Sequence, residues 1–413
     1  MYHLKTTAGA QRSLFAARRG CLDAATKPKP PHNRKSKPMS KEQMTLLCLA
    51  HLDWDNVWQR PQQVMTRLTT RYDVWYVDPP HISDAIDAPE LCELYIDQGV
   101  RVLRPIFPAK QAAQPDGYWE AWYSLLPDLL RRVGSETIMW VFSPYADGLV
   151  ERAKSHIQLA VYDCMDDLAS FRGASPEMHR RESNLLGLVD LVFTGGHSMY
   201  ETRKERHPRV YCFPSGVDVA HYQQVQKEDT PIAAACVGIP HPQLGYFGVL
   251  DERIDWQLIA AVAACRPSWH WVLVGPTAKV DPSELPQAAN IHYLGKQPYA
   301  ELPTFLKSFD VATMPFALNE ATTFISPTKT LEYLAGGKAV ISSSVADVVA
   351  FYSEIVAIAD GADAWISCVE VMLGAGPDEL RGRNERAQPL LAANTWDAIA
   401  TQMADLADEQ LRR

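Results

Sequence analysis

The chain has 413 residues, of which 47% are hydrophobic and 22% are charged, so it is long enough for two or three domains with ordinary cores. No run approaches 18 consecutive apolar residues, which predicts no membrane-spanning helix. The net charge of −9 hides an asymmetry, because residues 1–41 hold ten basic residues and one acidic residue while the rest of the chain is acidic. An acidic body argues against broad nucleic-acid binding, so we expect no nucleic-acid partner.

The first 40 residues are rich in Lys, Pro and Ser and lack hydrophobic periodicity. We expect residues 1–40 to be a disordered basic extension without catalytic residues. Two interpretations stay open: the extension holds the protein near an anionic membrane surface, or the natural start of the chain is Met39 or Met44. We expect a cytoplasmic protein, with peripheral contact at the inner membrane face under the first interpretation.

The eight cysteines are scattered, without a Cys-x-x-Cys pair or a Cys/His cluster at ligand spacing. Several lie in apolar runs such as Leu47-Cys48-Leu49, which is typical of buried thiols in a reducing compartment. The sequence therefore predicts neither a disulfide framework nor a metal site.

From residue 45 onward, short apolar runs alternate with helical patterns, which indicates parallel α/β sheets. In the first half the pattern predicts strands over residues 45–50, 73–77, 137–142, 158–162, 188–194 and 210–213. In the second half it predicts a strand at 232–237 or 245–248, then strands over 269–274, 291–294, 311–315, 339–342 and 355–358. A polar stretch, 223–230, is interpreted as a linker, so we predict two domains over residues 41–225 and 231–393.

Open α/β sheets bind ligands beyond the carboxyl ends of their strands, so the loops that leave strands are the candidate site. The loop after the first strand contains Trp54, Trp58 and Arg60. Trp and Arg side chains suit stacking on sugar faces or binding of an anion. The alternative is that Trp54 and Trp58, four residues apart, pack the start of a helix.

Three carboxylates, Asp163, Asp166 and Asp167, follow the strand 158–162. Carboxylates crowded at a strand end repel one another unless a cation, a hydroxyl donor or solvent satisfies them. They would orient hydroxyl groups or assist proton removal, with Asp166 as the candidate. The alternatives are an N-cap of the next helix or an imitation of a metal-binding motif. His197, after the strand 188–194, either faces the same cleft or belongs to a capping turn.

The segment SPTKTLEYLAGGKAVISS, residues 326–343, predicts a helix followed by a buried strand. Ser326 is the predicted N-cap and Pro327 the first helical residue. Lys329 lies in the first turn and Glu332 lies three residues on, along the same face. Because a helix N-terminus favours an anion, this arrangement suits a nucleotide diphosphate and its ribose hydroxyls. The alternative is a capped surface helix with an internal ion pair.

The same segment resembles the nucleotide-sugar motif in the C-terminal domain of GT-B glycosyltransferases, in particular the family 4 (group 1) type. Four further segments resemble that family in the expected order: WDNVWQRPQQVM (54–65), VYCFPSGVDVAHY (210–222), GYFGVLDERIDWQLI (245–259) and IHYLGKQPYAELPTFLKSFDVATMPF (291–316). The first of these is similar to the opening loop and helix of a bacterial subgroup that includes teichuronic-acid and exopolysaccharide glycosyltransferases.

The resemblance implies the GT-B fold, in which two Rossmann-like, doubly wound parallel-sheet domains face a central cleft and a C-terminal helix, 394–413, packs back on the first domain. It implies transfer of a sugar from a nucleotide diphosphate sugar to a glycan or lipid-linked acceptor, in cell-surface polysaccharide synthesis. The donor would contact Gly248, Arg253, Gly295, Ser326, Lys329 and Glu332. The acceptor would contact Trp54, Trp58, Arg60 and His197.

Catalysis would fall to Asp166, Arg60, Arg253 and Lys329. The last two offer permanent positive charge to the leaving diphosphate, so we expect no metal and no cofactor beyond the donor itself.

One position departs from the family pattern. The family has two glutamates eight residues apart, and Phe324 occupies the place of the first while Glu332 is the second. The first glutamate contacts the donor sugar in the family, so the donor sugar and the stereochemical outcome stay open. Two other functions stay open as well: another GT-B enzyme such as a sugar-nucleotide epimerase, and a catalytically silent GT-B subunit that binds a partner.

Overall fold

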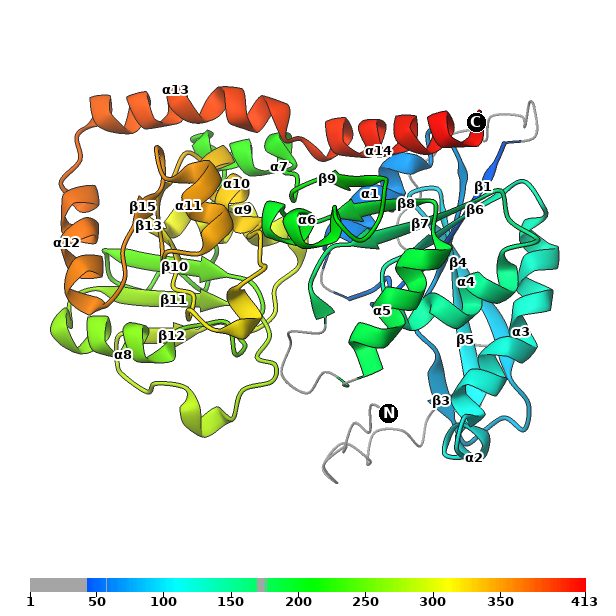
Figure 1. Ribbon diagram of the computed structural model, residues 1–413. Helices are drawn as coiled ribbons and strands as arrows, with labels where there is room; N and C mark the ends of the chain where they lie inside the picture. The colour runs from blue at the N-terminus through cyan, green and yellow to red at the C-terminus, as the bar shows by residue number, and fades with distance from the viewer. Residues whose placement is uncertain (1–42, 57, 169–174, 176) are drawn as a thin grey trace.

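The computed structural model describes residues 43–56, 58–168, 175 and 177–413. The predicted basic extension, residues 1–40, lies outside the described residues. The described chain forms two lobes, each built on a largely parallel sheet with helices packed on it (Figure 1). The predicted α/β class is therefore confirmed.

The sheet of the first lobe has nine strands within the described residues, in the order β3-β5-β2-β1-β6-β7-β8-β9, with β4 antiparallel to β5. The central strands β1, β6 and β7 are buried at every residue, which is typical of parallel strands covered on both faces. The strands are β1 (Thr45–Leu49), β2 (Asp73–Val77), β3 (His81–Ser83), β4 (Glu90–Asp97), β5 (Val100–Pro108), β6 (Thr137–Val141), β7 (Leu159–Cys164), β8 (Leu191–Thr194) and β9 (Val210–Cys212).

Helices follow most of these strands. Loops at the carboxyl ends of strands β1, β6 and β7 face the second lobe. They are α1 (Arg60–Leu68), α2 (Ala109–Ala112), α3 (Gly117–Val133), the 3-10 helix η2 (Pro144–Ala146), α4 (Asp147–Ala153), α5 (Glu177–Leu188) and α6 (His197–Arg203).

The sheet of the second lobe has six parallel strands, in the order β12-β11-β10-β13-β14-β15. This is the doubly wound order. The chain adds strands on one side of β10 up to β12 and then continues on the other side from β13 to β15, so the topological switch point lies between β10 and β13. The strands are β10 (Gln243–Phe247), β11 (His270–Val274), β12 (Ile291–Tyr293), β13 (Val311–Met314), β14 (Ala339–Ser342) and β15 (Ala357–Ile358). The helices are α7 (Val219–Gln223), η4 (Gln224–Gln226), α8 (Trp256–Cys265), η5 (Pro282–Glu284), η6 (Tyr299–Glu301), α9 (Leu302–Ser308), η7 (Glu320–Thr322), α10 (Lys329–Ala335), α11 (Ala346–Tyr352) and α12 (Ala362–Leu373).

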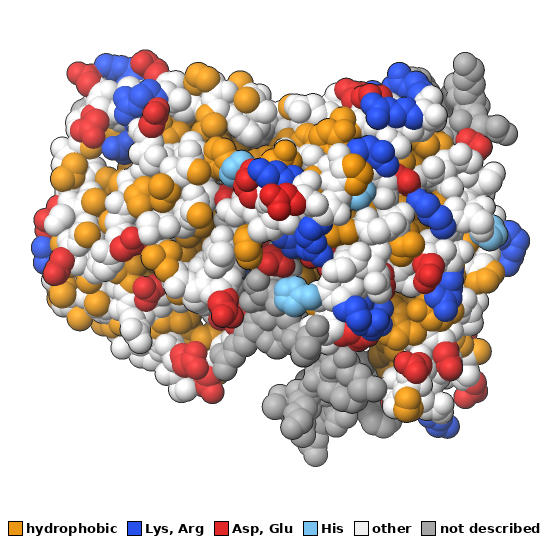
Figure 2. Space-filling model, viewed as in Figure 1, with side chains coloured by type: hydrophobic (Ala, Val, Ile, Leu, Met, Phe, Trp, Pro, Cys, Tyr) orange, Lys and Arg blue, Asp and Glu red, His pale blue; other side chains and the backbone are white. Residues whose placement is uncertain are grey.

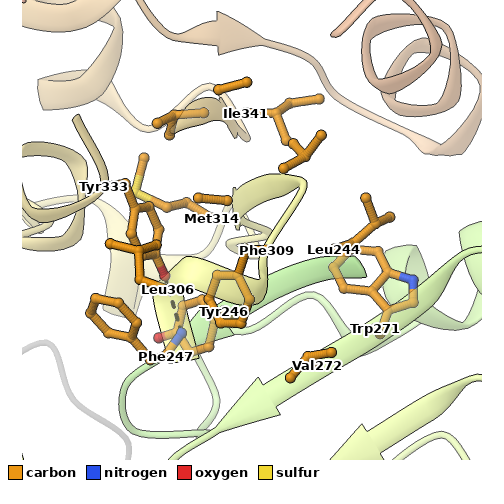
Figure 3. Packing of buried hydrophobic residues seen from close by; sticks show 14 of the residues in the cluster. Leu244, Tyr246, Phe247, Trp271, Val272, Leu306, Phe309, Met314, Tyr333 and Ile341 are labelled. Atoms are coloured by element: carbon orange, nitrogen blue, oxygen red, sulfur yellow. Dashed lines mark hydrogen bonds between the residues drawn. The ribbon is translucent and has the colours of Figure 1, made fainter. Parts of the chain in front are cut away.

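Aromatic packing fixes α10 against the carboxyl end of β10 (Figure 3). The rings of Phe247 and Tyr333 meet edge to face with centroids 4.8 Å apart, and the Phe247 amide donates to the Tyr333 hydroxyl at 3.1 Å. Close approach also needs Gly245, since a Cβ at that position would stand 2.0 Å from the Phe309 ring. The core therefore sets the position of the first turn of α10, which carries Lys329 and Glu332.

Two long C-terminal helices, α13 (Pro377–Ala393) and α14 (Trp396–Leu411), run along one side of both lobes (Figure 1). Leu391 belongs to the hydrophobic core of the second domain, whereas Trp396 and Met403 belong to a hydrophobic core cluster of the first domain. Tyr72 donates to Asp408 at 2.6 Å, which ties α14 to the first domain. The predicted 394–413 helix thus packs on the first domain.

Some boundaries differ from the prediction. Val217, Tyr222 and Val225 belong to the hydrophobic core of the second domain, so the first domain ends before residue 217 rather than at 225. The stretch 223–230 is therefore not a free linker. The glutamines of 223–230 give this stretch a polar pattern in the sequence. In the fold, the buried side chain of Tyr222 anchors α7 to the core of the second domain. The first strand of the second domain is β10, and 232–237 is irregular chain followed by turns. Strands β3 to β5 were not predicted; β3 has only three residues, and β4 has no buried residue and mixes polar with apolar ones.

Candidate active site

A cleft with a cavity of about 870 Å³ lies between the two domains. Its lining comes from the loops that leave β1, β6 and β7 of the first sheet and β10 to β13 of the second, together with the start of α10. Both sheets therefore contribute the carboxyl ends of strands at their topological switch points, where open α/β sheets bind ligands.

Two glycine turns shape the second-domain side. Gly248, after β10, has φ +146°, and a Cβ there would stand 2.2 Å from Lys329 Cε. Gly275, after β11, has φ +147°, and a Cβ there would stand 1.7 Å from the Gly248 carbonyl oxygen. Only glycine allows the lysine side chain to lie directly over the β10 loop.

The predicted nucleotide residues Lys329, Glu332 and Arg253 all line this side of the cleft. Burial lowers the pKa of Lys329, and the neighbouring carboxylates of Glu332, Asp251 and Asp166 oppose that shift. Burial raises the pKa of Glu332 to about 7, against the Lys329 ammonium, which lowers it. The arrangement places a cation and a titrating carboxylate one helical turn apart.

Arg253 is oriented by a local ion pair. Its Nη2 lies 2.7 Å from Asp251 Oδ2 and its Nε lies 3.0 Å from Asp251 Oδ1. Although burial lowers the pKa of Arg253, the Asp251 carboxylate raises it above its usual range. The guanidinium therefore stays charged and is held at the cleft wall, as a bidentate pair requires.

Ser326 lines the cleft, but the prediction that it caps α10 is wrong. The helix begins at Lys329, its N-cap residue is Thr328, and no side chain caps it. The helix therefore begins two residues later than the Ser-Pro pair predicts. Ser326 instead packs beside Gly196 of the first domain, where an added Cβ would stand 3.0 Å from Ser326 Cβ.

Gly295 is not among the cleft-lining residues, although Lys296 and Gln297 beside it are. Its φ of +67° allows the turn after β12, and its carbonyl accepts from the Gly275 amide at 2.8 Å. Phe324, at the place of the family's first glutamate, packs against a core cluster of the first domain.

The first-domain side differs most from the prediction at Arg60. Its side chain is 2% exposed, and its Nη2 lies 2.8 Å from Asp163 Oδ1, which is 0% exposed. Its Nη1 donates to the Phe213 carbonyl at 2.6 Å. The sequence predicts that Arg60 contacts a ligand. In the structure its guanidinium instead forms a buried ion pair that joins α1 to β7.

The two tryptophans of the same loop have different roles: Trp54 packs in the first domain, and Trp58 lies at the cleft. Trp54 is 2% exposed, contacts the Tyr76 ring at a centroid distance of 4.9 Å and donates from its indole to Asp97 at 3.1 Å. This favours the packing alternative for Trp54. Trp58 is half-buried and lies 6.3 Å from the Tyr299 ring of the second domain, so it spans the cleft.

The three strand-end aspartates are separated in space. Asp163 is paired with Arg60, and Asp167 lies 3.3 Å from Arg203 Nη2. Asp166 alone lines the cleft, where its charge acts on Arg253 and Lys329 across the cavity. The part of the chain that the structure describes contains no group of three or more His, Cys, Asp or Glu residues placed to hold a metal ion.

His197 does not line the cleft. It begins α6 and its ring stands edge to face with Phe351 of α11, so it lies at a contact between the domains. Asp347 of α11 accepts from the His197 amide at 3.1 Å, from the Ser198 amide at 3.3 Å and from the Ser198 hydroxyl at 2.5 Å. The capping alternative for this turn is thus correct, and the cap comes from the other domain. Figure 2 shows charged side chains of both signs at the junction between the domains on this face.

Several cleft residues were missed by sequence reasoning. His51 and Tyr145 line the first-domain side, and Tyr299 lines the second. Tyr299 stacks on His221 with centroids 4.3 Å apart and accepts from Gln63 of α1 at 3.2 Å. The position of His51 directly after the first strand was an available signal, whereas the contacts of Tyr299 involve partners far away in the sequence.

Three comparisons bear on this geometry. The family model described as Glycosyl transferases group 1 matches residues 241–374. TuaH of Bacillus subtilis (strain 168), whose name describes a teichuronic acid biosynthesis glycosyltransferase, is 25% identical over 202 residues, covering 47% of this chain and 50% of TuaH. The chain therefore spans about half the length of the curated relative that it matches.

Among solved structures, the E. coli trehalose-6-phosphate protein bound with UDP-2-fluoro glucose has a TM-score of 0.66 at 10% identity, covering 89% of this chain and 99% of that one. Sucrose-phosphate synthase of Thermosynechococcus elongatus has a TM-score of 0.62 at 15% identity, covering 88% and 98%. Anabaena HepE in complex with UDP has a TM-score of 0.61 at 14% identity, covering 89% and 100%.

At these identities the structural likeness shows the fold, which is that of the GT-B glycosyltransferases. In the described part of the chain, no helix combines the length and apolarity needed to span a bilayer. Residues 241–374 therefore match the Glycosyl transferases group 1 model, within a chain that has the GT-B fold predicted from its motifs.

Proposed function

We propose that the protein transfers a sugar from a nucleoside diphosphate sugar to a hydroxyl group of a glycan or lipid-linked acceptor, in cell-surface polysaccharide synthesis. One observation carries the proposal: Lys329 and Arg253 of the second domain meet Asp166 of the first across one cleft. The group 1 match and the name of TuaH support it, as do the UDP-containing titles of similar structures.

In this reaction the bond between the sugar C1 and the diphosphate oxygen breaks while a bond from the acceptor oxygen to C1 forms. The leaving diphosphate keeps the electron pair, and Lys329 and Arg253 stabilise its negative charge. In this proposal Glu332, which lines the cleft, accepts hydrogen bonds from the ribose hydroxyls. Asp166 orients the acceptor hydroxyl or takes its proton.

We propose further that no divalent metal is needed, because fixed cations already stand beside the leaving group. Turnover in EDTA is expected to equal turnover with Mg²⁺. Loss of turnover in EDTA that Mg²⁺ or Mn²⁺ restores would contradict this, and would point to Asp166 and its neighbours as metal ligands.

A lipid-linked acceptor would bring the protein to the inner face of the membrane, so we propose peripheral association there. Cosedimentation with vesicles of phosphatidylglycerol tests this. Binding that survives removal of residues 1–40 would assign it to the folded domains, and no binding at low salt would contradict it.

The function is tested by a thermal-shift screen against UDP, GDP, ADP and TDP sugars. A ligand that binds only the native state raises its melting temperature, so one nucleotide class should stand out. Turnover of that donor with no acceptor other than water, giving an isomerised nucleotide sugar, would favour an epimerase. Binding without transfer or hydrolysis would favour a silent binding subunit, and no binding to any nucleotide would overturn the proposal.

A further inference from the structure

The charges that line the cleft are divided between the two domains. The second domain contributes more cations than carboxylates: Arg253, Lys279, Lys296 and Lys329 against Asp251 and Glu332. In the described chain the first domain contributes the carboxylates Asp55, Asp97 and Asp166. Its lining cation, Arg60, is 2% exposed and already neutralised by Asp163.

Two of the first-domain carboxylates, Asp97 and Asp55, contact aromatic side chains of the same domain. Asp97 accepts from the Trp54 indole at 3.1 Å, and Trp54 is itself buried in the core. Asp55 lies beside the Tyr95 hydroxyl, and Asp166 lies within electrostatic range of His51. An ionised carboxylate only accepts hydrogen bonds, and its two oxygens match a pair of ring hydroxyls.

Apart from Arg60 Nη2, which lies in the ion pair with Asp163, two buried polar atoms of first-domain lining residues lack a hydrogen-bond partner among the described residues, His51 Nδ1 and Tyr145 Oη. Buried polar atoms are normally hydrogen-bonded, so these two positions indicate a polar ligand. Because burial lowers the pKa of His51, its imidazole adds no positive charge at neutral pH. This side of the cleft thus offers acceptors, a neutral imidazole and a phenol hydroxyl.

We infer that the acceptor bound in the first-domain half of the cleft is an uncharged polyhydroxyl sugar ring, and that phosphorylated or acidic rings are rejected. The inference rests on the proposed transfer function and names the substrate class of that site. Three carboxylates without a free arginine or lysine among the described lining residues repel an anionic ring, while they accept hydrogen bonds from neutral hydroxyls. The second domain attracts the diphosphate, so the two substrates are sorted by charge.

The test uses the full-length protein, saturated with the nucleoside diphosphate that the thermal-shift screen selects. Saturation-transfer NMR measures binding of matched ring pairs: glucose with glucose 6-phosphate and with glucuronic acid, and galactose with galacturonic acid. Glycosylation of the same compounds is measured with the intact donor. We expect the neutral member of at least one pair to bind and react roughly tenfold better than its anionic partner at low salt, with the ratio narrowing in 0.5 M NaCl because salt screens the repulsion.

Charge-removing variants sharpen the test. Asp97→Asn keeps an oxygen acceptor for the Trp54 indole and removes one negative charge, and Asp55→Asn removes another. In the double variant the neutral-to-anionic ratio should fall at least threefold, roughly what two screened charges contribute. Asp363→Asn, an exposed carboxylate on α12 outside the cleft lining, is the matched control and should leave the ratio unchanged.

Equal or better use of the anionic rings by the wild-type protein would overturn the inference while the proposed transfer stands. Binding of neither ring type to the diphosphate-loaded protein would overturn it too, because the first-domain side would then not be a sugar site. Failure of the donor screen itself would instead remove the proposed function.

Discussion

The two sides of the cleft are built from sheets of the same doubly wound kind, yet they use their arginines in opposite ways. In the second domain Arg253 is held at the cavity wall by Asp251, a neighbour two residues away. In the first domain Arg60 turns inward to Asp163, 103 residues away, and becomes part of the core. An arginine or lysine in a strand-end loop is therefore a candidate for binding a substrate only when no buried carboxylate neutralises its charge.

The largest expected effect separates these two uses of arginine. Arg60→Ala leaves Asp163 buried without a counter-ion, so the free energy of unfolding should fall by about 3–5 kcal/mol. Urea unfolding at neutral pH measures it. Arg67→Ala is the control, because Arg67 pairs with the exposed Asp397 and should cost at most about 1 kcal/mol. Wild-type stability with complete loss of transfer in Arg60→Ala would show that Arg60 acts on a substrate after all.

The next largest effect concerns the cation of the second domain. Lys329→Ala removes a charge-assisted contact to the diphosphate, so affinity for the free nucleoside diphosphate should fall roughly ten- to a hundredfold. Lys204→Ala, at an exposed lysine directly after α6 that is paired with Glu201, should leave this affinity unchanged. Equal diphosphate affinity in wild type and Lys329→Ala would remove Lys329 from the site.

The difference between the two sides also explains what the sequence could predict. Lys329, Glu332 and the glycine after β10 lie within local patterns of a strand, a turn and a helix start, and such patterns are readable from neighbouring residues. The partners of Arg60 and of the α6 turn are far away in the chain, Asp347 lying 149 residues from Ser198. Neither pairing leaves a local signal.

The α10 helix start shows a smaller limit of the same kind. The Ser-Pro pair is a typical beginning of a helix, and the sequence alone places the cap at Ser326. In the fold Ser326 is packed against Gly196 of the other domain, and the helix begins at Lys329. Tertiary contacts moved a boundary that the local pattern placed two residues earlier.

A pH dependence sharpens the account of Glu332. Its pKa is raised to about 7 in the folded protein, so the native state binds a proton more tightly than the unfolded chain does. The stability contributed by this proton is fully present below the ordinary glutamate pKa and is lost as the pH rises from there to about 7, above which it changes no further. Glu332→Gln lacks that loss, so it should lie within about 1 kcal/mol of wild type near pH 5 and exceed it by roughly 3 kcal/mol at pH 8.

Denaturant titrations of both proteins at several pH values give this difference. The same Gln variant should bind the nucleoside diphosphate more weakly at pH 8, because a carboxylate accepts ribose hydrogen bonds better than an amide. A stability difference that does not change between pH 5 and pH 8 would show that Glu332 does not titrate in this range.

The central claim is that the second domain binds the nucleoside diphosphate while Asp166 faces it from the first domain without holding it. Calorimetric titration of the selected nucleoside diphosphate into Asp166→Asn, in EDTA, tests this claim most directly, with the transfer rate measured on the same sample. We expect a dissociation constant within about twofold of wild type or slightly lower, since the variant removes a negative charge near Lys329, together with a strong loss of transfer. Diphosphate binding that collapses in Asp166→Asn, or transfer that stays at the wild-type rate, would contradict the account.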